Sequence, residues 1–132
     1  MSISISSSAN VLARIGQAHD VAFGAYILPA GPMRDALENA ARHGAHVAVT
    51  LQADPFFDRR GALGGMNAAG AAALRGAGAR VTLLPSAQVA FHLKAAVCDG
   101  VAYLDDRNWP ARGGDTVVAD DDPRENVGGR RD

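Results

Sequence analysis

Three largely apolar runs, separated by segments of helical character, constrain the fold of this chain most. The runs cover residues 21–28, 45–51 and 80–84, and predominantly apolar runs of this length are typical of strands buried on both faces. Residues 32–42, which open on a proline, and residues 67–75, for which Asn67 is the expected N-cap, have helical patterns. The order β-α-β-α-β predicts an α/β domain with a parallel sheet and right-handed crossovers.

The pattern changes after the third run. Residues 89–98 and 101–104 resemble strands and are separated only by Asp99-Gly100, a dipeptide that favours a hairpin turn. Antiparallel strands are therefore expected to join the parallel ones in a mixed sheet.

Both ends of the chain have simpler patterns. Residues 9–19 predict a short amphipathic helix, and residues 116–119 predict a last strand. Residues 120–132 are charged and almost free of apolar side chains, which predicts a disordered tail. We therefore expect one domain over residues 9–119 followed by this tail.

Composition excludes several classes of function. A formal net charge of -1 provides no broad positive field that would gather nucleic acid regardless of sequence. Cys98 is the single cysteine, so one chain can form neither an internal disulfide nor a cysteine zinc cage. The N-terminal segment does not resemble a secretory signal, and no apolar window has the roughly 20 residues needed to cross a bilayer. We expect a cytoplasmic protein whose contact with a membrane, if any, is peripheral.

Two side chains suited to phosphate chemistry lie close together in the expected strand over residues 89–98. His92 and Lys94 are two residues apart, and the period of a strand places both on one face. Lys94 is the only lysine of the chain. A compact ammonium can lie against a phosphoryl oxygen, and an imidazole can attack phosphorus or donate a proton near neutral pH.

With Asp99, these residues form the pattern His92-x-Lys94-x4-Asp99, and the chain resembles the phospholipase D superfamily from about residue 15 to residue 118. The resemblance implies a three-layer α/β/α domain and a phosphodiester hydrolase that needs neither metal nor cofactor. In such enzymes His92 would be the nucleophile or the acid that protonates the leaving oxygen. Lys94 and Asn108 would bind the phosphoryl oxygens, and Asp99 would support a histidine.

The sequence departs from this family where relatives carry Gly-Ser. Here Asp105-Asp106 follows the hairpin, and the interval from Asp99 is one residue shorter. A three-residue turn over residues 99–101 would place His92 opposite Asn108, whereas a two-residue turn would place Lys94 opposite Asp105. We predict the three-residue turn, because only that register builds the family's site.

One motif supplies half of the expected active site, since one histidine attacks and another protonates the leaving group. The resemblance therefore implies a two-fold homodimer or a second motif-bearing half in a longer protein. A phospholipid is the expected substrate rather than nucleic acid, because the chain has little net charge. A nuclease of the same superfamily and a non-catalytic phosphate-binding half-domain are the alternatives. His19, His43 and His46 are expected to be structural.

Overall fold

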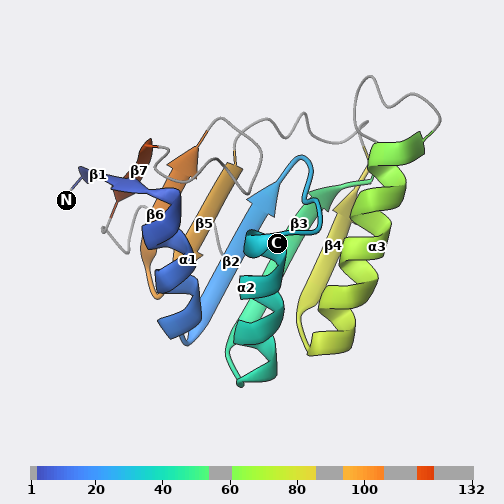
Figure 1. Cartoon of the computed structure of the whole chain (residues 1–132), viewed down its shortest axis with the longest axis horizontal. Helices are drawn as coiled ribbons and strands as arrows, with labels where there is room; N and C mark the ends of the chain where they lie inside the picture. The colour runs from blue at the N-terminus through green and yellow to red at the C-terminus, as the bar shows by residue number, and fades with distance from the viewer. Residues whose placement is uncertain (1–2, 54–60, 86–93, 106–115, 121–132) are drawn as a thin grey trace.

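A seven-stranded mixed sheet, with three helices packed on one of its faces, forms the described part of the chain (Figure 1). The computed structural model describes residues 3–53, 61–85, 94–105 and 116–120. The strands are β1 (Ile3–Ser7), β2 (Asp20–Ala25), β3 (His46–Gln52), β4 (Arg80–Leu84), β5 (Lys94–Cys98), β6 (Val101–Asp105) and β7 (Thr116–Asp120). The helices are α1 (Ser8–Gln17), α2 (Pro32–Arg42) and α3 (Ala62–Ala77). Strand order is β1-β7-β6-β5-β2-β3-β4.

The predicted parallel unit is confirmed. Strands β2, β3 and β4 are parallel neighbours, and α2 and α3 make the two crossovers on the same face of the sheet. Helix α2 begins at the proline, which suits a first helical turn, and buries Met33, Leu37 and Ala40. The expected helix at residues 9–19 and the expected last strand are present as α1 and β7.

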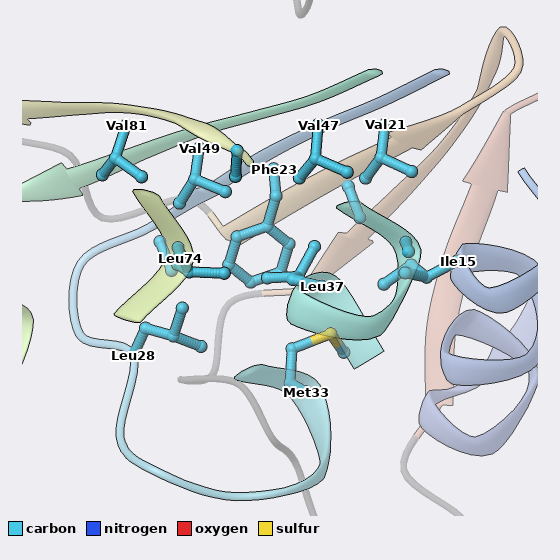
Figure 2. Close-up of a cluster of buried hydrophobic side chains, with 14 of the residues drawn as sticks. Ile15, Val21, Phe23, Leu28, Met33, Leu37, Val47, Val49, Leu74 and Val81 are labelled. Atoms are coloured by element: carbon cyan, nitrogen blue, oxygen red, sulfur yellow. The ribbon is translucent and has the colours of Figure 1, made fainter. Parts of the chain in front are cut away.

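The core lies between the sheet and the helices (Figure 2). Phe23 is 1% exposed and lies at its centre, with side chains from all three helices around it. The opposite face of the sheet carries a smaller buried cluster of Ala22, Val97 and Ala102. The α/β class and the mixed sheet are confirmed. Of the three expected layers, the described residues show the sheet and one layer of helices.

The hairpin between β5 and β6 differs from the prediction. Cys98 pairs with Val101, so the turn has two residues and not three. Asp99 has φ +50° and Gly100 has φ +88°, the positive values that both central residues of a type I′ turn require. Aspartate and glycine tolerate this conformation, and its twist matches that of the paired strands. The same register places Lys94 opposite Asp105.

One strand was not predicted, and one helix begins earlier than predicted. Strand β1 precedes residue 9 and pairs antiparallel with β7 along its whole length. Helix α3 begins five residues before the expected N-cap, because packing against the sheet outweighs the low helix propensity of its glycines. The prediction that Asn67 caps this helix is wrong, since Asn67 lies inside it and is fully buried.

Within the described ranges, no helix is long and apolar enough to cross a membrane.

Candidate functional site at the carboxyl edge of the sheet

Five strand ends meet at one edge of the sheet. The parallel strands β2, β3 and β4 end there, at Ala25, Gln52 and Leu84. Strand β5 runs antiparallel to β2, so it begins at that edge with Lys94, and β6 ends there with Asp105. The chain leaves β2 toward β3 and β4, then returns to the other side of β2 as β5 (Figure 1). Ligands of open α/β sheets bind outside the carboxyl ends of the strands at such a reversal.

Lys94 is the one predicted site residue that the structure places at this edge. It is the first residue of β5, next to the pair that Ala95 forms with Gly24 of β2. His92 and Asn108 lie outside the described residues, so their roles remain predictions. The three-residue turn that supported a place for Asn108 beside His92 is absent.

Asp99 lies at the other end of β5, and the structure does not bring it together with Lys94. The separation is on the order of 15 Å, at about 3.3 Å for each residue of a strand. The carboxylate of Asp99 accepts hydrogen bonds from the backbone N–H of His19, at 2.9 and 3.2 Å, and of Asp20, at 2.8 Å. The Asp99 N–H donates in turn to the Asp20 carbonyl oxygen at 2.9 Å. Asp99 therefore fastens the hairpin to the start of β2.

The remaining chemically reactive side chain near this motif is Cys98. Its thiol is buried in the core, 1% exposed. Burial raises the pKa of Cys98 to about 12, and the charge of Asp99 acts in the same direction while Arg14 opposes it. Because only a thiolate is a strong nucleophile, Cys98 serves as a small core residue.

Asn67, predicted to cap a helix, lies at the carboxyl ends of β2 and β3. Asn67 is 0% exposed and joins α3 to the ends of β2 and β3. The sequence held one signal of this role. Asn67 precedes Ala71 and Leu74 by four and seven residues, which places a polar side chain on the buried face of a helix made of small residues.

Three histidines gather at the opposite, amino edge of the sheet. His19, His43 and His46 line a cavity of about 350 Å³ near the ends of α1 and α2. All three are exposed. In the described segments, no three His, Cys, Asp or Glu side chains are grouped in a way that could hold a metal ion.

These observations define a mixed α/β domain whose candidate site lies where β5 begins. Solved structures with the same fold include a phospholipase D family member, Nuc, from Salmonella typhimurium, with TM-score 0.71 and 19% identity over 94% of this chain and 86% of that chain. NucT from Helicobacter pylori gives TM-score 0.65 and 14% identity over 94% and 87%. The polyphosphate kinase of Porphyromonas gingivalis gives TM-score 0.64 and 19% identity, with 92% of this chain matching 24% of the kinase.

No family model matches the sequence, and no curated protein matches it. The chain has the fold of the phospholipase D superfamily, as the sequence resemblance implied.

Proposed function

We propose that this chain is a phosphodiester hydrolase of phospholipase D type that acts through a phosphohistidine. The proposal depends on the position of Lys94, which begins β5 at the carboxyl edge of a sheet with the superfamily fold. The motif residue His92 precedes Lys94 by two positions, so the pair would stand at the same edge. Phosphoryl transfer needs little from a protein beyond a nucleophile, an acid and well-placed positive charge.

The proposed reaction has two steps. The neutral imidazole of His92 attacks phosphorus, a P–N bond forms, and the P–O bond to the leaving group breaks as a second histidine gives that oxygen its proton. Water then attacks phosphorus, loses a proton to the second histidine, and releases His92 as the P–N bond breaks. Lys94 binds the non-bridging oxygens, where its ammonium offsets the charge that develops. Asn108 has no role in this proposal, because the two-residue turn is not the register that would place it opposite His92.

The second histidine must come from outside this motif. We propose a two-fold dimer in which the partner subunit's His92 gives and takes the proton, because an isologous contact brings the same residue of both copies to one axis. A second motif-bearing half in a longer protein would serve equally. The site is incomplete without one of them.

Asp99 has a different proposed role from the one that the family resemblance implies. Its carboxylate is engaged with the backbone of His19 and Asp20 at the amino edge. We therefore propose that it positions β5 and does not touch substrate.

Asp105 is proposed to weaken the binding of phosphate at the site. Directly opposed residues of an antiparallel pair have neighbouring Cβ atoms, and the register opposes Asp105 to Lys94. A carboxylate there would compete with the substrate phosphate for the ammonium. The same feature favours the alternative of a non-catalytic phosphate-binding half-domain.

Phospholipid is the proposed substrate class, on the basis of the net charge of -1. The discriminating experiment offers the purified protein a chromogenic phosphodiester, phosphatidylcholine vesicles and single-stranded DNA. Hydrolysis should fall at least a hundredfold in His92→Ala and Lys94→Ala, since removal of a nucleophile or an electrostatic clamp costs roughly that much or more. His43→Ala, at an exposed position on the amino edge, is the matched control and should retain activity.

The product distribution assigns the substrate. Cleavage of vesicles supports the lipid enzyme, and cleavage of DNA with steep salt dependence supports a nuclease. Trapping of an acid-labile phosphoprotein that His92→Ala abolishes supports the covalent step. A folded dimer that hydrolyses none of the three substrates would contradict the enzymatic proposal.

A further inference from the structure

Asn67 is the one buried polar side chain that the described helices contribute. Its Nδ2 donates to the carbonyl oxygens of Tyr26 at 2.9 Å and Gln52 at 2.7 Å, and its Oδ1 accepts from the Leu28 N–H at 3.0 Å. Both amide protons are used, and every partner is a main-chain atom outside α3: two in the segment that follows β2 and one at the end of β3. The side chain therefore cross-links three segments of backbone.

The position of this cross-link in the sheet is specific. The ladder between β2 and β3 advances in a fixed register, and its last pair is Ala25 with Leu51. Continued by one residue, that register would pair Tyr26 with Gln52. These are the two residues whose carbonyl oxygens Asn67 holds. Asn67 thus bridges the two backbones at the position where the ladder stops.

The end of β2 also pairs with the start of β5. Gly24 pairs with Ala95, so Ala25 and Tyr26 extend beside the point where Lys94 begins β5. Restraint of Tyr26 and Leu28 by Asn67 therefore fixes the backbone that flanks Lys94. A buried carboxamide with all its polar atoms satisfied is a rigid support of this kind.

We infer that Asn67 is a positioning residue for the phosphodiester site, an inference that rests on the proposed function for its catalytic consequence. It holds the ends of β2 and β3 apart at a set distance and so sets where Lys94 meets a phosphoryl group. A misplacement of about 1 Å at such a site can cost on the order of a hundredfold in rate.

Few other side chains could form these three hydrogen bonds at once. Aspartate would direct a carboxylate at two carbonyl oxygens, alanine would reach none of the three partners, and leucine would leave all three without a partner. Asn67→Asp offers a test through pH, because its protonated form can donate to one of the two carbonyl oxygens.

The experiment compares wild type, Asn67→Ala and Asn67→Asp with Ile15→Ala, a control that cuts a fully buried side chain out of α1. Backbone amide exchange is followed by NMR at a temperature where all four proteins are folded. In Asn67→Ala, exchange should accelerate about tenfold or more at Leu28, Lys94 and Ala95, but not at Cys98. The control should show no such preference for the Lys94 end of β5.

Activity is measured on the same proteins. The kcat of Asn67→Ala should fall at least tenfold with a smaller change in KM, while Ile15→Ala stays within about twofold. The kcat of Asn67→Asp relative to wild type should rise as the pH is lowered, which loss of stability alone would not produce in folded protein.

The two hypotheses fail separately. A wild-type protein without hydrolytic activity contradicts the proposed function, and the exchange pattern still tests Asn67. Equal acceleration at both ends of β5 in Asn67→Ala, or acceleration confined to Leu28, would overturn the inference.

Discussion

The most informative perturbation is the removal of the Asp99 carboxylate, because the family resemblance and the structure give it different roles. If Asp99 supports a catalytic histidine, its loss should reduce kcat by about a hundredfold or more. If it fastens the hairpin to β2, its loss should lower stability and leave the chemistry of folded molecules almost unchanged. The structure favours the second outcome, since the carboxylate binds the N–H groups of His19 and Asp20.

The magnitude follows from those two donors. A hydrogen bond to a charged acceptor contributes about 1.5 to 3 kcal/mol, and exposure places these at the lower end because water can replace the carboxylate. Asp99→Gly should therefore lower the free energy of unfolding by about 2 to 3 kcal/mol. Asp99→Ala should cost roughly 1 kcal/mol more, since φ is +50° at this residue. Asp99→Asn keeps one acceptor and tolerates this φ, so it should cost the least.

Urea unfolding gives the free energies, and kcat is measured at a temperature where each variant is fully folded. The expected order of stability is wild type, Asn, Gly, Ala, with a fall in Tm of roughly 10 °C for the glycine variant. The kcat of the folded variants should stay within about threefold of wild type. A variant of near-normal stability with kcat reduced a hundredfold would refute the positioning role.

Three further predictions concern single side chains. Asp105→Asn should tighten the binding of inorganic phosphate several-fold in a titration, because the register opposes Asp105 to Lys94; unchanged affinity would separate the two. Arg75 donates to the Val81 carbonyl oxygen of edge strand β4 at 2.8 Å and so covers part of an edge that could pair with another molecule. Arg75→Ala should lower stability by about 1 kcal/mol and increase light scattering through aggregation, and a variant that remains monodisperse would argue against protection of this edge. The pKa of Cys98 is about 12 in the folded state and 9.0 when the thiol is exposed by unfolding, so the folded state binds more protons between these pH values and stability should fall as pH rises through them. Cys98→Ala should flatten the fall in a series of urea unfolding experiments, and an unchanged slope would assign the fall to other groups.

The parallel half of the fold could be predicted because each of its strands and helices is specified by residues within that element. The residue run at 80–84 coincides with β4, and the proline at residue 32 marks the start of α2. Apolar runs and helix-start residues report their own structure, and short crossovers leave few topologies for them to form.

The parts that could not be predicted depend on contacts between distant residues. Strand β1 is an alternation of isoleucine and serine, and its pairing partner β7 lies more than a hundred residues later. Asn67 was expected at a helix start because asparagine favours that position, but its partners belong to the ends of β2 and β3. Local preference cannot report a role that the sheet creates.

The hairpin places the two ends of the interval between Lys94 and Asp99 at opposite edges of the sheet. The interval from Lys94 to Asp99 contains the whole of β5, from its first residue at the carboxyl edge to the turn residue that follows Cys98. A strand of this length carries the chain across the sheet, so a residue at one end and a residue at the other must meet different surroundings. Lys94 lies at the carboxyl edge of the sheet, whereas the Asp99 carboxylate accepts from the N–H groups of His19 and Asp20 at the amino edge. Shortening β5 by two residues preserves the alternation of side chains but would move the Asp99 carboxylate away from β2 or draw Lys94 back from the carboxyl edge. Such a variant should therefore lose both stability and hydrolytic activity.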